Sequence, residues 1–141
     1  MTLTPETEAK IRASFAAQTL MSSLGAELGE ITQGFARITA PILPTSLQQH
    51  GAAHAGLTFA IGDSAAGYAA LAMFDPDHEI MTVEMKINLL RPAVGDLLIA
   101  EGRVVKPGRR LTVVSADVFA EMAGQRKHVA TLQGTMIPVE T

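Results

Sequence analysis

Hydrophobic and polar residues alternate along much of the second half of the chain, with the period of two that β-strands produce. The clearest case is residues 81–89, where polar Thr82 and Glu84 begin the alternation and apolar side chains follow at Val83, Met85, Ile87 and Leu89. Turn residues then separate three further apolar segments. Together these patterns predict four strands, at 81–89, 97–106, 111–121 and 127–139. Because the connecting turns are short, we expect the strands to pair antiparallel.

The first part of the chain has the pattern of a helix followed by two short strands. Thr4 is a typical N-cap, and Pro5 suits the first helical position. A loose apolar face then runs through residues 5–24 at Ile11, Phe15, Leu20 and Leu24. Gly25 is a suitable stop for this helix. Short apolar segments at 26–31 and 35–40 predict two strands joined by a turn.

Residues 53–73 form the longest apolar stretch and predict a long helix. Eleven of these 21 residues are Ala or Gly, and Asp63 lies at the centre. A membrane span is disfavoured, because a central Asp opposes insertion by about 2.5–3.5 kcal/mol. We therefore expect a buried helix, whose small side chains let a sheet approach the helix axis closely.

One long helix and six antiparallel strands predict an α+β domain in which a curved sheet wraps around the helix. No linker, repeat or low-complexity segment interrupts the sequence, so we expect a single domain over residues 1–141. An open sheet has exposed edges, and edge strands commonly pair across a dimer. We therefore expect a homodimer, or a homotetramer built from two dimers.

Composition and charge narrow the classes of function. The net charge of −3 and the pI near 5.7 give no sign of a nucleic-acid-binding surface. The chain has no cysteine, which excludes disulfides, a thiolate nucleophile and Cys-ligated metals. No secretory signal pattern is visible. We therefore expect a cytoplasmic protein with neither a nucleic-acid nor a membrane partner.

Asp63 is the most informative residue of the sequence. It is the only acidic residue between Glu30 and Asp75, and Ala, Gly and apolar residues surround it. An ionised carboxylate in apolar surroundings is costly unless it is paired, hydrated or protonated. Its place in the long helix therefore indicates acid–base or hydrolytic chemistry. The structural alternative is a helix-interior Asp that pairs with a neighbouring group in the fold or the dimer.

The residues around this helix resemble the signature of a known family. They are Gln48-Gln49-His50-Gly51-Ala52-Ala53-His54-Ala55-Gly56, followed by Ile61-Gly62-Asp63-Ser64-Ala65-Ala66-Gly67. This pattern resembles that of the hotdog-fold acyl-CoA thioesterases of the phenylacetic-acid-degradation (PaaI-like) type. Their signature is Asn or Gln, two residues, Gly, two residues, His-Gly-Gly, then Asp or Glu seven residues on. The segment 82–88 with Arg91-Pro92, and the pairs Gly108-Arg109 and Gly134-Thr135, also fit, so the resemblance covers roughly residues 20–139.

The resemblance implies a hotdog fold and hydrolysis of an acyl-CoA thioester at sites shared between two subunits. Asp63 would act as a general base on water or as a nucleophile. The backbone N–H groups of Ala55 and Gly56, at the start of the helix, would polarise the thioester carbonyl. Physical chemistry supports this role, because a helix N-terminus offers unpaired N–H groups and a positive dipole end to a developing oxyanion.

Three further residues match the family pattern. Gln48 occupies the position of the Asn or Gln that faces the water or the substrate, and Thr82 matches a Ser or Thr that helps to hold the water. His54 would support the turn and the oxyanion region. Each also has a plainer interpretation, as a loop amide, a strand threonine and a hydrogen-bonded structural histidine. Ala55 departs from the pattern, because it adds a methyl group where the family has Gly, although it keeps the N–H donor.

Coenzyme A would enter as part of the substrate, and we expect no other cofactor and no metal. Candidates for contacts with its phosphates are the basic residues Lys86, Arg91, Lys106, Arg109 and Arg110, since Arg and Lys suit phosphate. Each of them taken singly is otherwise an ordinary solvated charge. His50 and His54 have a spacing that can serve a metal, but no third ligand stands at a telling spacing, so a zinc site is not favoured.

Two other functions stay open from the sequence. A hotdog enoyl-CoA hydratase or dehydratase would use His54 and Asp63 as an acid–base pair. A non-catalytic acyl-CoA-binding sensor would explain Ala55 as a lesion in the site, and a dimer with no ligand is the plainest alternative. The acyl group also stays open, because aryl, medium-chain and hydroxylated aromatic groups all fit the pattern.

Overall fold

The computed structural model describes residues 3–140, so residues 1–2 and 141 of the predicted domain lie outside the described part. In chain order the elements are α1 (Pro5–Ala16), α2 (Thr19–Leu24), β1 (Glu27–Thr32), β2 (Phe35–Pro41), the short 3-10 helix η1 (Pro44–Ser46), α3 (Ala55–Leu71), β3 (His78–Leu89), β4 (Leu97–Lys106), β5 (Thr112–Met122) and β6 (Gln125–Glu140).

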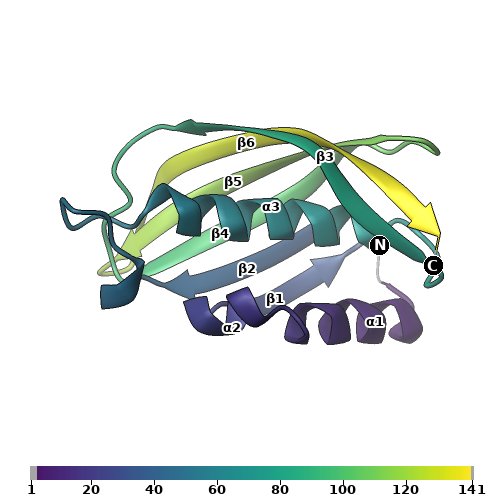
Figure 1. Ribbon diagram of the computed structural model, residues 1–141, viewed down its shortest axis with the longest axis horizontal. Coiled ribbons are helices and arrows are strands. Elements are labelled where there is room, and N and C mark those ends of the chain that lie inside the picture. Colours follow the sequence, from purple (N-terminus) through teal and green to yellow (C-terminus); the bar gives the residue numbers. More distant parts are fainter. Residues whose placement is uncertain (1–2, 141) are drawn as a thin grey trace.

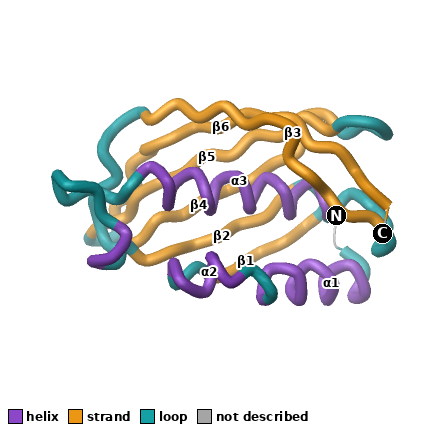
Figure 2. Tube along the Cα trace, in the orientation of Figure 1, coloured by secondary structure: helices purple, strands orange, loops and turns teal. Residues whose placement is uncertain are grey.

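The six strands form one antiparallel sheet in the order β1-β2-β4-β5-β6-β3. The sheet curves around α3, while α1 and α2 lie along the side of the molecule that carries β1 (Figures 1 and 2). This arrangement confirms the predicted α+β hotdog fold, in which a curved sheet wraps a long helix and an N-terminal helical segment lies beside it.

Small side chains let α3 lie directly on the sheet. Ala65, Ala66, Ala69 and Ala70 are fully buried along the helix. On the facing strand β4, a Cβ added to Gly102 would stand only 2.3 Å from the carbonyl carbon and oxygen of Ala65. Backbone therefore meets backbone at this point, which is the close approach that the Ala- and Gly-rich sequence predicts.

The single helix predicted over residues 5–24 is wrong, because the structure has two helices there. Gln18 adopts an extended conformation, with φ −79° and ψ 102°, between α1 and α2. The break changes the phase of the apolar face, so that Leu20 is 56% exposed whereas Met21 is 2% exposed. At the break the Gln18 side chain reaches the hydroxyl of Tyr68 on α3. No local pattern contains this contact, because it joins distant segments.

The other element boundaries differ from the prediction by small amounts. The start of α3 is Ala55 instead of residue 53, because the Ala53 N–H bonds to the carbonyl of Ala93 at 2.9 Å outside the helix. β3 begins at His78, three residues before the clear alternation, and the remaining ends shift by at most two residues. Among the described residues, no helix is both long enough and apolar enough to cross a membrane.

β3 is an edge strand with a partly apolar, exposed surface. Within residues 3–140 it pairs with β6 alone, and Met81, Val83 and Leu89 on it are each more than half exposed. An edge of this kind invites pairing with another strand, because its outer backbone groups have no strand partner within the described chain.

Gly102 and Gly67 give a matched pair that tests the contact between α3 and the sheet. A methyl group at Gly67, on α3 itself, would meet Met136 Cε at 3.7 Å, which is an ordinary contact, instead of backbone at 2.3 Å. We expect Gly102→Ala to lower the free energy of unfolding by about 3 kcal/mol or more, since overpacking costs roughly 1–3 kcal/mol even where side chains can yield. Gly67→Ala should raise it by up to about 1 kcal/mol through helix propensity.

Denaturant unfolding of the two variants, at equal protein concentration, measures this difference. If Gly102→Ala were as stable as the unmodified protein, helix and sheet would not be in backbone contact at this point.

Candidate active site

Asp63 and Thr82 meet in a small pocket. Asp63 lies midway along α3 and Thr82 lies on β3, and the Thr82 hydroxyl donates a hydrogen bond to Asp63 Oδ1 at 2.9 Å. The pocket around them has a volume of about 160 Å³. Helices α1 and α3, the link between α1 and α2, and strand β3 contribute its polar lining, which includes Ser14, Gln18, Ser64, Tyr68 and Glu79.

A β-bulge turns Thr82 toward the helix. The register of β3 against β6 shifts between Thr82 and Glu84. As a result Thr82 pairs with Met136, which is fully buried, whereas Glu84 pairs with Thr135 and accepts a hydrogen bond from its hydroxyl at 3.0 Å. The sequence alternation places Thr82 and Glu84 on one polar face. That prediction is wrong, because the extra residue of the bulge reverses the alternation at this point.

The carboxyl group of Asp63 is harder to ionise than an ordinary one. Burial raises the pKa of Asp63 above its usual value of 3.8, and the hydrogen bond from Thr82 lowers it in part. Burial is the larger effect, because withdrawing the carboxylate from water penalises its charged form. No other residue of α3 carries a formal charge. A carboxylate with a raised pKa is a stronger base, which suits the removal of a proton from water.

The start of α3 holds the second group of predicted site residues. His54 is the N-cap, and its Nδ1 accepts a hydrogen bond from the N–H of Gly56 at 2.7 Å. A Cβ at Gly56 would stand 2.9 Å from that nitrogen, so this cap requires glycine. Ala55 is exposed, and among residues 3–140 no acceptor bonds to its N–H. Of the two predicted oxyanion donors, Ala55 is therefore the available one in this conformation.

Gln48 organises the loop before α3. Its Oε1 accepts hydrogen bonds from the backbone N–H groups of His50, at 2.6 Å, and Ala52, at 3.2 Å. Because both bonds use the amide oxygen, the Nε2 group remains as a donor. Gln48 and Ala55 line a pocket of about 350 Å³ together with Arg91. The loop and the helix start therefore present two donors and a cation to one space.

The two groups of residues do not meet within one chain. Asp63 follows Ala55 by eight residues, which corresponds to about 12 Å of rise along a helix. The pocket of Asp63 and the pocket of Gln48 and Ala55 have no lining residue in common. One chain therefore presents a base at mid-helix and a donor at the helix start, at separate places.

The five basic residues predicted to contact phosphate are dispersed. Arg91 lines the pocket of Gln48, whereas Lys86 borders a different hollow between β3 and β6. The other three are exposed around the connection from β4 to β5: Lys106, Arg109 and Arg110. Of the five, only Arg91 lies beside other predicted site residues in the single chain. The described part of the chain has no group of three or more His, Asp or Glu residues that could hold a metal ion.

One contact that closes the Asp63 pocket on its α1 side is not predicted by the sequence patterns. The side chain of Tyr68 is 5% exposed, and its hydroxyl accepts a hydrogen bond from Gln18 Nε2 at 2.6 Å and lies 3.1 Å from Ser14 Oγ. One signal points to it, because Tyr68 is the only tyrosine of the chain and follows Asp63 by five residues in an Ala- and Gly-rich helix. Its two partners lie far away in sequence and carry no signal of their own.

Fold and site together define a class of protein. A curved antiparallel sheet around a long helix, a partly buried base on that helix and a free N–H at its start suit a hotdog-fold thioester hydrolase. The family model of the thioesterase superfamily matches residues 50–125, more than half of the chain. The chain belongs to this superfamily.

Individual relatives agree with this assignment. A solved thioesterase family protein from Silicibacter pomeroyi is similar at 37% identity and a TM-score of 0.93, covering 96% of this chain and 99% of that one. The acyl-coenzyme A thioesterase PaaI of Escherichia coli is 27% identical over 113 residues, 79% of this chain and 76% of the relative. The structure of E. coli PaaI, from the phenylacetic acid degradation operon, shares the fold with a TM-score of 0.87.

A protein of Saccharolobus solfataricus, described as an esterase by inference, is 28% identical over 100 residues. The match covers 71% of this chain and 66% of the relative, just under two thirds of its length.

The raised pKa of Asp63 predicts how stability responds to pH. Ionised Asp63 is less favourable in the folded protein than in the unfolded chain, so its neutral form carries stability that is complete below pH 3.8 and is lost as pH rises through the raised folded-state pKa. Asp63→Asn removes the charge, and its amide oxygen can still accept the bond from Thr82. We expect this variant to have a higher Tm than the unmodified protein at pH 7, with the difference shrinking as pH falls toward 3.8.

Thermal unfolding of both proteins across this pH range, at one fixed concentration, measures the effect. A lower Tm for Asp63→Asn at pH 7 would show instead that the ionised carboxylate stabilises the fold.

Proposed function

We propose that the protein hydrolyses acyl-CoA thioesters to free acid and CoA, at sites that two copies of the chain build together. In each site Asp63 and Thr82 come from one copy, and Gln48 and Ala55 come from the partner. The observation that carries the proposal is the partly buried carboxylate of Asp63, whose pocket does not include the start of α3. The exposed N–H of Ala55 lies in a separate pocket of the same chain and is the oxyanion donor that would act together with such a carboxylate.

The open edge of β3 is the surface through which two copies would meet. A two-fold axis at this edge pairs two β3 strands antiparallel and joins the two sheets into one. The same axis sets the two α3 helices antiparallel, so that the start of one helix approaches the middle of the other. Met81 and Val83, both more than half exposed in the single chain, would then be covered. A homodimer, or a tetramer of two such dimers, follows from this arrangement.

The proposed reaction uses these groups in order. Asp63 removes a proton from a water molecule as the water oxygen attacks the carbonyl carbon of the thioester. The N–H of the partner's Ala55, at the positive end of α3, donates to the oxyanion that forms. Collapse of the tetrahedral intermediate breaks the C–S bond, and the departing thiolate takes the proton from Asp63. The raised pKa of Asp63 makes its carboxylate a stronger base for this step.

Coenzyme A is the proposed carrier of the acyl group. The E. coli relative is named an acyl-coenzyme A thioesterase, and Arg91 lines the pocket of Gln48, where a phosphate of CoA would find a cation. The other candidate cations would act only if the oligomer brings them near the ligand: Lys86, Lys106, Arg109 and Arg110. The proposed acyl group is aryl or medium-chain, and no cofactor besides the CoA of the substrate takes part.

The geometry favours hydrolysis over the addition of water to an enoyl-CoA. That reaction would need His54 and Asp63 as an acid–base pair. His54 already serves as the N-cap of α3, because its Nδ1 accepts the hydrogen bond from the N–H of Gly56. Asp63 has only Thr82 as its hydrogen-bond partner among the described side chains.

Release of free CoA, followed with a thiol-reactive dye over aryl, short and long acyl-CoA esters, tests the proposal. The chain has no cysteine, so the protein itself adds no signal. We expect turnover with at least one acyl class, and a loss of about 10²–10⁴ in kcat for Asp63→Asn, because general-base catalysis contributes a factor of that size. Asp75→Asn is the matched control, since Asp75 is an exposed carboxylate in the turn before β3.

Undiminished turnover by a folded Asp63→Asn protein would contradict the role assigned to Asp63. Binding of CoA esters by the unmodified protein without any turnover would favour the non-catalytic sensor, and addition of water to an enoyl-CoA would favour the hydratase.

A further inference from the structure

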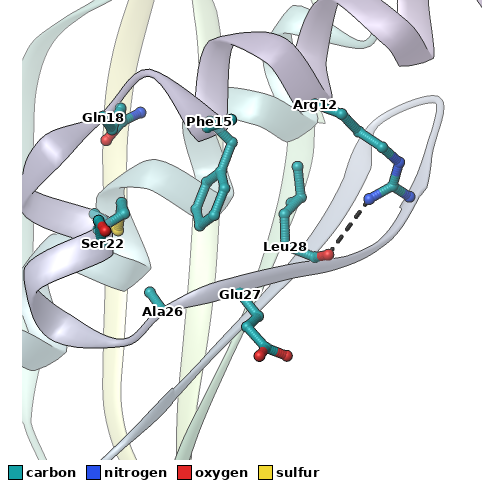
Figure 3. A pocket seen from close by; sticks show the side chains of 9 residues that line it. Arg12, Phe15, Gln18, Ser22, Ala26, Glu27 and Leu28 are labelled. Atoms are coloured by element: carbon teal, nitrogen blue, oxygen red, sulfur yellow. Dashed lines mark hydrogen bonds between the residues drawn. The ribbon is translucent and has the colours of Figure 1, made fainter.

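Two hollows adjoin each other beneath the N-terminal helices. The first is the pocket of Asp63, of about 160 Å³. The second is a groove of about 460 Å³ between α1, α2 and β1, whose apolar lining includes Phe15, Met21 and Leu28 (Figure 3). Of the described residues, Gln18 alone lines both. Its side chain therefore stands where one hollow passes into the other.

Hydrogen bonds hold the Gln18 side chain in this position. Gln18 Nε2 donates to the hydroxyl of Tyr68 at 2.6 Å, and Ser14 Oγ lies 3.1 Å from the same hydroxyl. The ring of Tyr68 packs edge-on against Phe15, with the ring centroids 6.1 Å apart. Ser14 of α1, Tyr68 of α3 and Gln18 between α1 and α2 thus meet at one buried hydroxyl and form a wall between the pocket and the groove.

We propose that Gln18 and Tyr68 form the far wall of the acyl pocket and limit the substrate to short or compact acyl groups. This inference rests on the proposed function and narrows its aryl or medium-chain acyl group to a single ring or a short chain, by naming the residues that set acyl length. Tyr68 follows Asp63 by five residues, which is about 7.5 Å of helix rise. A carbonyl group placed at Asp63 therefore leaves room for a short chain or a single ring before the wall.

The chemistry of the wall makes it an obstacle to a longer chain. An apolar chain that passed between Gln18 and Tyr68 would break their hydrogen bond and leave the buried Tyr68 hydroxyl without that donor, which is unfavourable. Beyond the wall, the groove offers apolar side chains and more volume than the pocket itself. Removal of the wall should therefore join the two hollows and admit the distal carbons of a longer acyl group.

The Gln18 side chain can be removed without dismantling the helices around it. Gln18 is the N-cap residue of α2, but its side chain makes no capping bond. Helix α1 is held independently, since Ile11 is fully buried, Lys10 pairs with Glu79 at 3.1 Å and Arg12 donates to the carbonyl of Leu28 (Figure 3). Loss of Gln18 therefore changes the wall more than the scaffold.

The test is the acyl-length profile of Gln18→Ala. CoA release is measured with butanoyl-, hexanoyl-, decanoyl- and dodecanoyl-CoA, and the ratio of kcat/KM for decanoyl to that for butanoyl is compared with the unmodified protein. We expect the ratio to rise roughly tenfold or more, since a single methylene group that does not fit a closed pocket already changes kcat/KM by a factor of about 10 or more. Tyr68→Phe keeps the ring and removes the hydroxyl that holds Gln18, so it should shift the ratio in the same direction by less.

Gln33→Ala is the matched control, because Gln33 is an exposed glutamine in the turn between β1 and β2; its profile should equal that of the unmodified protein. Binding of S-butyl- and S-decyl-CoA thioethers, which cannot be hydrolysed, gives a second readout by calorimetry. It should show the same gain in relative decyl affinity for Gln18→Ala even if turnover is absent, in which case only the proposed function fails. The proposed wall would be contradicted if Gln18→Ala and the unmodified protein had the same acyl-length profile and the same ratio of thioether affinities. It would also be contradicted if the unmodified enzyme preferred dodecanoyl-CoA to butanoyl-CoA.

Discussion

Gly102 lets strand β4 touch the backbone of α3 directly, and this contact sets the position of the central helix. Because no side chain separates helix from sheet there, α3 can lie inside the curve of the sheet and is fixed in rotation about its own axis. Ala65 faces β4, and a residue two positions earlier on a helix points about 200° away. Asp63 is thereby directed away from β4, toward the side where β3 and α1 border its pocket. The packing of small residues thus sets the direction of the one charged side chain of the helix.

That side chain is placed at a cost to stability and gains a chemical property in return. Burial raises the pKa of Asp63, and a single hydroxyl, that of Thr82, opposes the effect. A carboxylate that served only the fold would be expected to have more hydrogen-bond donors, which would lower its pKa. The pocket also lies beside β3, whose outer edge has no strand partner within the described chain. Within the described part of one chain, the site thus lacks its proposed oxyanion donor beside Asp63, and the adjacent sheet lacks a strand on the outer side of β3. These two features are the physical basis for the proposal that a second copy completes both.

The sequence predicts the parts of this molecule whose signal is local. The Ala- and Gly-rich segment gives the central helix, and period-two alternation gives the later strands. Asp63 is conspicuous by its isolation, and the resemblance pairs it with Thr82. The alternation nevertheless assigns Thr82 to the wrong face, because a bulge depends on how β3 pairs with β6. Local patterns likewise cannot show the helix break at Gln18, since the break accompanies a hydrogen bond to Tyr68, fifty residues away.

In the proposed dimer each site takes its base from one copy and its oxyanion donor from the other. Ala55 is the first residue of α3, a position that tolerates proline. The preceding His54 is already extended, at φ −62° and ψ 139°, as a residue before proline must be. Ala55→Pro therefore removes the N–H donor and little else, whereas Ala55→Gly keeps it and serves as the control.

The most direct measurement is the turnover of mixed dimers that contain one Ala55→Pro chain and one Asp63→Asn chain, isolated through two different affinity tags. We expect each variant alone to be strongly impaired, whereas the mixed dimer keeps one intact site and recovers about half of the unmodified kcat per dimer, as two-fold symmetry requires. A mixed dimer no more active than its two parent variants would contradict the shared site.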